Sequence, residues 1–148
     1  LWLNNVLVGE YGLNAAVAGY YGVPVLMISG DQTACAQAVE LLGPLETAVV
    51  KQARGRFAAE CLTPPVAQEQ IQLSARRAVE RLAEGDAPDP YVVDTPVAIA
   101  VEFISSDQAD RASRLPDSQR AGLRLNFSAP DMLAAYASFR ASVALAAA

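Results

Sequence analysis

The segment most suited to carry out chemistry is Gly9-Glu10-Tyr11-Gly12-Leu13-Asn14-Ala15-Ala16. It places a carboxylate between glycines, where a predicted strand ends and a predicted helix begins. Ligands of parallel α/β folds bind at this edge of the sheet, and the positive end of the helix dipole favours an ionised Glu10. A rigidly held carboxylate suits a divalent metal and repels phosphate. We therefore predict Glu10 as a metal ligand, with an ordinary helix-start residue as the alternative.

Three more polar residues are candidates for a role near such a site. Asn14 lies one turn after Glu10 on the same side of the predicted helix, so its side chain could hydrogen-bond a group that holds a metal ligand, or bond locally. Lys51 is the only lysine and ends a predicted strand, where it would either face a ligand or remain a solvated surface cation. Asp31 is interpreted as a helix N-cap rather than a ligand.

Composition excludes several classes of function. The 148 residues include no histidine, so this chain alone has no imidazole for a metal site, a general base or a nucleophile pair. Eleven Lys and Arg against sixteen Asp and Glu give a net charge of −5, which argues against nucleic acid as a partner. With 53% hydrophobic residues, the chain can bury a sizeable core as one domain or two small lobes.

Targeting signals and disulfides are not predicted. The glycine spacing near Glu10 departs from G-x-G-x-x-G, which also excludes a dinucleotide site. No segment reads as a signal peptide or a membrane span. Cys35 and Cys61 both lie in apolar surroundings, and we predict that they are small buried hydrophobic residues in a reducing cytosol.

Strand and helix patterns alternate around Glu10. The predicted elements are a hairpin at 1–8 with Asn4-Asn5 as its turn, a helix up to Gly22, a strand at Val23–Ser29, a helix from Asp31 to Gly43, and a strand at Glu46–Val50. The apolar run Val23–Ser29 is typical of a strand buried on both faces in a parallel sheet. We predict an α/β fold in which residues 1–62 form part of a mostly parallel sheet flanked by helices, and this lobe carries the metal site.

Residues 63–148 predict a smaller α+β lobe. Its predicted elements are a helix from Thr63-Pro64 to Gly85, a surface connection at 86–96, a strand at Val97–Ile104, a short helix at Asp107–Arg114, a strand at Leu123–Phe127, and a last helix capped by Ser128. Apolar and polar residues alternate along both strands, as in a sheet with one buried face.

The segment around Glu10 also carries a resemblance to a known family. Val8–Ala15, followed by Ala18–Met27 and Ser29–Asp31, resembles the second half of the DppA-type D-aminopeptidases, the M55 family of zinc peptidases. Further matches in the same order are Ala48–Gln52, Arg56, Cys61–Pro64, Val101–Phe103, Asp131–Leu133 and Ala135-Tyr136. The resemblance covers most of the chain and is weak only at 86–94 and 107–122.

The resemblance implies a cytoplasmic metallo-aminopeptidase with a two-zinc centre, which releases N-terminal D-amino acids from short peptides such as D-Ala-D-Ala. It also implies a homo-oligomer built from rings, stacked into a decamer. The glutamate of the family's Gly-Glu-x-Gly-Leu-Asn segment is a zinc ligand, and it falls on Glu10. In the family, the remaining ligands and the catalytic histidine lie upstream of this segment. We therefore expect no catalytic residue in this chain, and a missing N-terminal half as its partner.

Two functions stay open on this basis. In the first, the chain is the C-terminal portion of a zinc-dependent D-aminopeptidase and is inactive alone, because one glutamate cannot hold two zinc ions. In the second, it is a non-catalytic α/β module for oligomerisation or binding, derived from that family. The absence of histidine favours the second if the natural gene starts at Leu1. The opening hairpin, the absent initiator Met and the intact segment at Glu10 favour the first, which we adopt.

Overall fold

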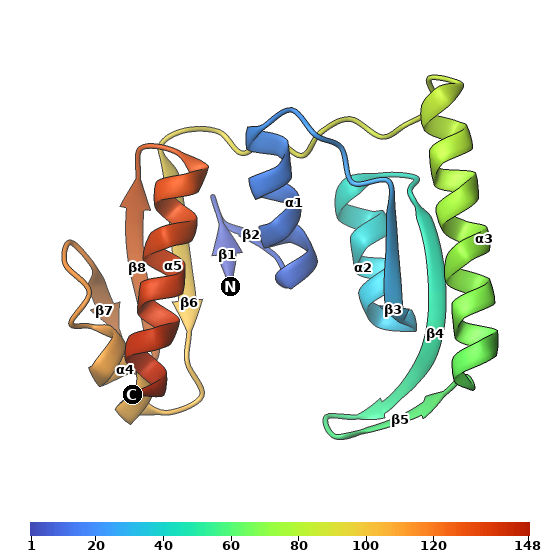
Figure 1. The fold of residues 1–148 in the computed structure, drawn as a ribbon. Coiled ribbons are helices and arrows are strands. Elements are labelled where there is room, and N and C mark those ends of the chain that lie inside the picture. The colour runs from blue at the N-terminus through green and yellow to red at the C-terminus, as the bar shows by residue number, and fades with distance from the viewer. The chain divides into compact units, whose positions relative to one another are not determined.

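The computed structural model describes all 148 residues, and their contacts divide into two compact units. The first unit joins residues 1–21 to residues 92–148, and the second unit consists of residues 22–91. In Figure 1 the first unit has the colours of both ends of the bar, and the second has the colours between them. Each unit contains its own sheet and its own helices.

This division differs from the predicted boundary between residues 62 and 63. Helix α3 (Pro64–Ala83), predicted to open the second lobe, packs against strand β4 (Glu46–Gly55) and belongs to the second unit. The hairpin at the start of the chain pairs instead with a strand near residue 100. Local periodicity identifies elements such as these, but it does not say which distant strand each of them joins.

The first unit contains a five-stranded sheet in the order β2-β1-β6-β8-β7, and every neighbouring pair is antiparallel. Its strands are β1 (Trp2–Leu3), β2 (Val6–Leu7), β6 (Val97–Glu102), β7 (Gln119–Ala121) and β8 (Arg124–Ala129). Buried and more exposed side chains alternate along β6 and β8, as their period-two pattern predicts. The sheet therefore turns one face to the core and the other to solvent.

The predicted opening hairpin is confirmed, and its turn residues explain it. Asn4 and Asn5 have φ angles of 44° and 68°, the left-handed pair that a two-residue turn requires. The Asn4 side chain donates a hydrogen bond to the Asp94 carbonyl and accepts one from the Ala98 N–H, both at 2.7 Å. These contacts fasten the hairpin to β6, and helix α1 (Glu10–Tyr20) begins three residues after β2.

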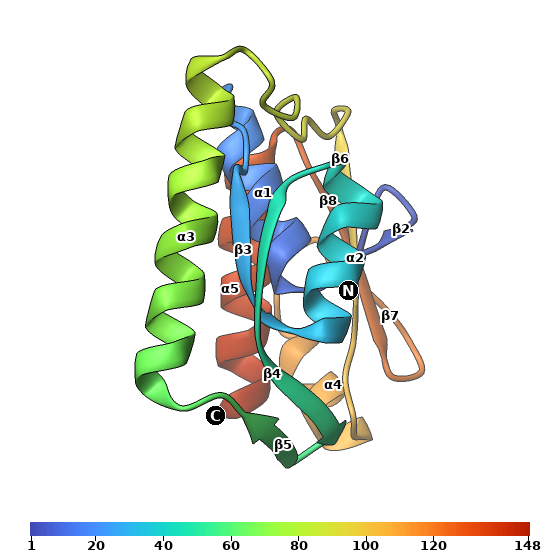
Figure 2. The ribbon, with the colours of Figure 1, turned by 90° about the vertical axis from the view of Figure 1, so that its right-hand side faces the viewer.

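Three helices complete the first unit: α1, α4 (Ser106–Ala112) and α5 (Met132–Ala147). Helix α5 lies along one face of the sheet, where it contacts β6 and β8, and both α1 and α4 contact α5 (Figures 1 and 2). The largest fully buried side chains of the whole chain all belong to this unit, and they are Leu3, Ile99, Leu125, Val97 and Ser142. Burial of each large apolar side chain contributes about 1.5–3 kcal/mol.

The last helix begins later than predicted. Ser128, predicted as its N-cap, lies in β8 and pairs with Ala98 of β6, so that prediction is wrong. The strand continues to Ala129 because its backbone finds partners in the sheet. The cap is Asp131, whose carboxylate accepts a hydrogen bond from the Ala134 N–H at 2.8 Å.

The second unit contains a three-stranded sheet in the order β3-β4-β5, with α2 (Gln32–Leu42) and α3 on its two sides (Figures 1 and 2). Strand β3 (Met27–Asp31) runs parallel to β4, and β5 (Ala58–Cys61) returns antiparallel to it. Asp31 caps α2 as predicted, because its carboxylate accepts hydrogen bonds from the Thr33 and Ala34 N–H groups, both at 2.9 Å.

The α/β class stands, but the prediction of a mostly parallel sheet is wrong, since β3–β4 is the only parallel pair. The predicted strand at Glu46–Val50 forms the first half of β4, but the extension of β4 to Gly55 and the strand β5 escaped prediction because their residues lack an apolar alternation. Cys61 lies on the β4–β5 hairpin and is exposed, contrary to its predicted burial, whereas Cys35 is buried in α2 as predicted. None of the helices is both long enough and apolar enough to span a membrane.

Candidate functional site

The candidate site lies in the first unit, where the opening hairpin leads into α1. Gly9 is the N-cap of α1 and offers no side chain to the first turn. A Cβ at residue 9 would lie 2.8 Å from Cε1 of the Tyr11 ring, so glycine leaves room for that ring beside the helix start. The Glu10 side chain occupies the first turn, is exposed, and has no hydrogen-bond or ion-pair partner in the chain. Glu10 is therefore available to an external ligand.

Glu10 and Asn14 line the same pocket, which has a volume of about 620 Å³. They are one helical turn apart on α1, and both are exposed. Other lining residues from the start of the chain are Leu1, Val8, Gly9 and Leu13, and those from α5 are Tyr136, Phe139, Arg140, Val143, Ala144 and Ala147. The structure thus brings together the two α1 residues that the sequence singles out.

The side of the pocket formed by α5 is the part that sequence reasoning missed. Tyr136 reads in the sequence as packing, and Arg140 only as a charge in an apolar helix. Residues 136, 140, 143, 144 and 147 fall on one face of a helix, and this spacing is the signal that could have grouped them. The Arg140 guanidinium has no ion-pair partner, so the pocket offers an anionic group, an amide and a cationic group over apolar walls.

The residues of this chain do not by themselves fit a zinc centre. A zinc site takes at least three protein ligands, and no group of three His, Cys, Asp or Glu side chains in the structure could hold a metal. Glu10 is the only acidic residue in the pocket lining, and the chain contains no histidine. Within these 148 residues, the pocket supplies one carboxylate ligand at most.

Lys51 belongs to the second unit, whereas the pocket residues belong to the first. It is paired in register with Asp31 of β3 and with Cys61 of β5, and its side chain is exposed. The pKa of the Asp31 carboxyl is lowered chiefly by the hydrogen bond from the Ala34 N–H, and also by the Lys51 charge. Lys51 lies within β4, which continues to Gly55 instead of ending before Lys51 as predicted, and it stands opposite the last residue of β3.

Comparisons with known proteins place this geometry in a family. The model of the D-aminopeptidase family Peptidase_M55 matches residues 1–141. The D-aminopeptidase of Bacillus subtilis (strain 168) is 39% identical over 137 residues, which cover 91% of this chain and 49% of that protein. The solved structure of the Zn-dependent D-aminopeptidase DppA from Bacillus subtilis, a self-compartmentalizing protease, matches with a TM-score of 0.87 and 35% identity, over 99% of this chain and 53% of that chain.

These matches confirm the resemblance seen at residues 8–31, and they carry it through both units. The chain spans about half the length of the relatives it matches. Those relatives are D-aminopeptidases, and the one of known structure depends on zinc. The chain belongs to the M55 family of D-aminopeptidases.

Proposed function

We propose that the chain is the C-terminal portion of a zinc-dependent D-aminopeptidase that releases N-terminal D-amino acids from short peptides such as D-Ala-D-Ala. One observation carries this proposal: Glu10 stands unpaired at a pocket, in the Gly-Glu-x-Gly-Leu-Asn segment of a chain that matches the family over residues 1–141. An ordinary helix-start glutamate would need neither the flanking glycines nor the pocket.

The proposed zinc centre is shared between this chain and residues outside it. Glu10 contributes one ligand, and the other ligands and the catalytic histidine come from the remaining half of the full-length protein. No group of three His, Cys, Asp or Glu side chains in this chain could hold a metal, so a zinc centre needs its other ligands from outside these residues. When bound, two zinc ions would activate a water and stabilise the tetrahedral intermediate of amide hydrolysis. The 148 residues alone are accordingly inactive.

Asn14 and Lys51 take supporting roles in this proposal. Asn14 shares the pocket with Glu10, so its amide is placed to hydrogen-bond a group that orients the metal ligand or the substrate. Lys51 is a candidate contact for an anionic group of the substrate, supported only by its pairing with Asp31 at the carboxyl end of the parallel strand β3.

Assembly and location follow from the family. DppA is described as self-compartmentalizing, and we extend this to a homo-oligomer of this protein, a ring or a stacked-ring decamer. We place the protein in the cytoplasm.

A non-catalytic oligomerisation or binding module is the second candidate. The lack of histidine and of a complete metal-binding group favours it. It differs from the first candidate in one measurable property. If the chain is such a module, the protein expressed from its natural gene hydrolyses no peptide even when zinc is supplied.

The test compares D-Ala-D-Ala with L-Ala-L-Ala as substrates of the protein expressed from its natural gene, with released alanine measured by chromatography. We expect release from the D-peptide only, loss of activity with a chelator, and recovery with zinc. The 148-residue chain, expressed alone, should release nothing. Hydrolysis by that chain alone would contradict the shared zinc centre, and no hydrolysis by the natural gene product would favour the binding module.

A further inference from the structure

Strand β3 is less buried than its sequence demands. The run Val23–Ser29 is almost entirely apolar, a composition typical of a strand covered on both faces inside a parallel sheet. In the structure the strand begins only at Met27, so Val23–Leu26 lie outside it, and none of these seven residues is fully buried. The apolar run therefore leads into a strand whose own large apolar residues, Met27 and Ile28, are only half-buried.

The position of β3 explains this shortfall. It pairs with β4 on one side only and forms the edge of the three-stranded sheet. The backbone N–H and C=O groups on its other side lack a strand partner. Natural edges are usually blunted by lysine, proline or a bulge. Strand β3 contains neither lysine nor proline, and its one register shift falls at its last two residues, Gly30 and Asp31.

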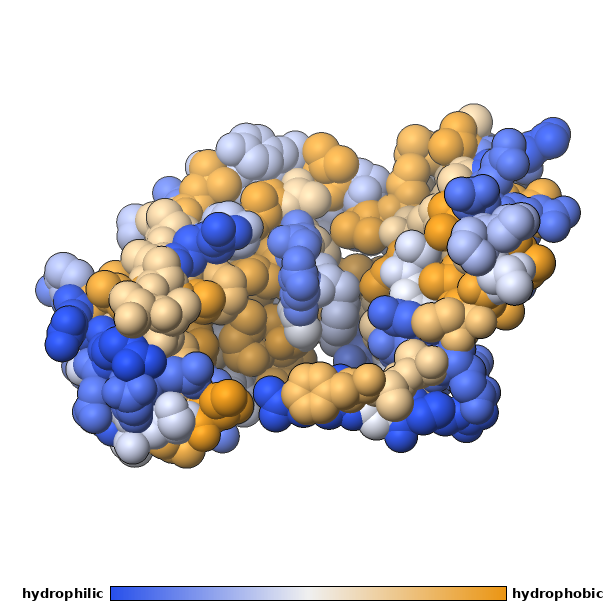
Figure 3. Space-filling view, turned by 60° about the horizontal axis from the view of Figure 1, so that its bottom comes forward, coloured by the Kyte–Doolittle hydropathy of each residue, from blue (hydrophilic) through white to orange (hydrophobic).

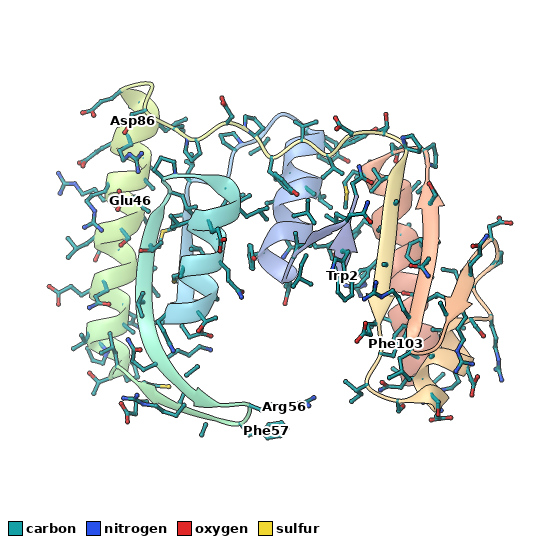
Figure 4. All side chains as sticks on the ribbon, turned by 180° about the vertical axis from the view of Figure 1, so that it is seen from behind. Trp2, Glu46, Arg56, Phe57, Asp86 and Phe103 are labelled. Carbon is teal, nitrogen blue, oxygen red and sulfur yellow. The ribbon has the colours of Figure 1, made fainter.

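The opposite edge of the same sheet provides a contrast. Strand β5 is short, all four of its residues are exposed, and Glu60 forms an ion pair with Arg54 at 2.7 Å. Beyond it, Arg56 lies over the Phe57 ring, 5.4 Å from its centroid, at the tip of the hairpin (Figure 4). This edge carries the charges that discourage pairing with another strand. The β3 edge differs in that most of its residues are half-buried and its only charged side chain, Asp31, caps α2.

The three-stranded sheet of the second unit does not cover all the apolar side chains of its two helices. Its buried residues are mostly small, and they are Cys35, Ala38, Leu45, Ala48, Ser74 and Ala78. Larger apolar side chains on both helices stay exposed, among them Val39 at 39% and Leu82 at 46%. A helix is about 10 Å wide and strands lie about 4.8 Å apart, so a helix on each face can cover more than the parallel pair β3–β4. Apolar surface is correspondingly frequent in the space-filling view of the chain (Figure 3).

We propose that β3 is an interior strand of the complete protein, and that its free edge pairs with an extended segment, apolar on both faces, from the half of the family's length that this chain does not span. The relatives are about twice as long as the chain, so such a segment is available to them. A second copy of the chain is the less suitable occupant, because two-fold symmetry would pair β3 with itself in antiparallel fashion, whereas β3 already runs parallel to β4. This inference goes beyond the proposed peptidase and does not depend on zinc.

Amide hydrogen exchange, read by mass spectrometry on the protein expressed from its natural gene, tests the proposal. We expect the amides of β3 to exchange as slowly as those of β4, and about 100-fold more slowly than those of the β5 edge. Their protection should stay unchanged when the protein is diluted and when zinc is removed with a chelator. A failure of the peptidase proposal would leave this result untouched, so the two can be told apart.

Two results would overturn the proposal. Exchange in β3 as fast as in β5 would show that the edge remains open. Protection that falls on dilution, or protection in a gene product whose intact mass is 15.6 kDa, would assign the edge to a second copy of the chain.

Discussion

The two units of the chain differ in what they bury. The first closes a five-stranded antiparallel sheet with α5 and encloses Leu3, Ile99 and Leu125 completely. The second has helices on both sides of three strands, yet its buried residues are mostly small. The first unit encloses large apolar side chains, whereas the second leaves most of its large apolar side chains at least partly exposed.

The contrast extends to the candidate site. The pocket with Glu10 is built within the first unit, from α1 and α5, and the same core that stabilises this unit holds these helices in place. The second unit contains the exposed Lys51 and the open edge of β3. The two units thus differ in how completely they bury their large side chains, and the predictions below probe that difference.

The largest effect is expected in the core of the first unit. Ile99 is 2% exposed, so Ile99→Ala should lower the free energy of unfolding by roughly 2–5 kcal/mol. The change is measured by urea unfolding followed by Trp2 fluorescence, since the only tryptophan lies in β1 under the Arg124 guanidinium and reports on this unit. The matched variant Ile28→Ala in the half-buried β3 should cost less, and it is followed by circular dichroism because Trp2 reports only on the first unit. Equal losses would contradict the contrast between the units.

A smaller effect is expected at the opening hairpin. Asn4→Ala removes two hydrogen bonds to Asp94 and Ala98 and places alanine at positive φ, so it should cost about 1–2 kcal/mol. Asn5→Ala is the control, because Asn5 shares the positive φ but makes no side-chain hydrogen bond. The same Trp2 signal measures both variants. If both lose the same stability, the hydrogen bonds of Asn4 do not hold the hairpin to β6.

The N-cap of α5 should contribute less again. Asp131→Ala removes the acceptor for the Ala134 N–H and should destabilise the first unit by about 1 kcal/mol. Asp131→Asn and Asp131→Ser keep a capping oxygen and should retain most of the stability. Thermal unfolding by circular dichroism measures the series. Full stability in the alanine variant would mean that the packing of α5 on the sheet makes its cap unnecessary.

The smallest effect concerns the second unit and appears only in acid. Hydrogen bonds from the Ala34 and Thr33 N–H groups, with help from Lys51, hold the pKa of Asp31 below its ordinary value of 3.8. A carboxyl with a lowered folded-state pKa adds stability that is complete above the unfolded pKa and disappears as the pH falls through the folded one. Asp31→Asn should therefore be less sensitive to acid than the parent below about pH 4, in helicity measured by circular dichroism. Identical acid transitions would exclude this contribution.

Local chemistry explains which parts of the fold could be predicted. Asn4-Asn5, Asp31 and Gly43 act through their own backbone preferences, and the structure has the turn, the cap and the helix end where the sequence predicts them. Pairing between distant strands has no such local signal. The antiparallel pairing of β1 with β6 could not be inferred from periodicity. The set of elements that make up the first unit could therefore not be inferred either.

Some residues of the candidate site are likewise marked by local sequence signals, whereas others reach it only through tertiary contacts. Glu10 and Asn14 stand out because glycines and helix spacing mark them, and the structure brings both to one pocket. Tyr136 and Arg140 reach that pocket only because α5 packs against α1, a tertiary contact that neither segment encodes alone. The zinc ligands beyond Glu10 could not be predicted, because this chain does not contain them.

The most direct test of the account is the zinc content of the protein expressed from its natural gene, measured by atomic absorption for the parent, Glu10→Gln and Glu69→Gln. Glu69 is an exposed glutamate on α3 and serves as the matched control. We predict that the parent and the control bind zinc, and that Glu10→Gln loses it while its fold, followed by circular dichroism, is unchanged. Zinc retained at the parent level in Glu10→Gln would contradict the assignment of Glu10 as a ligand of a shared zinc centre.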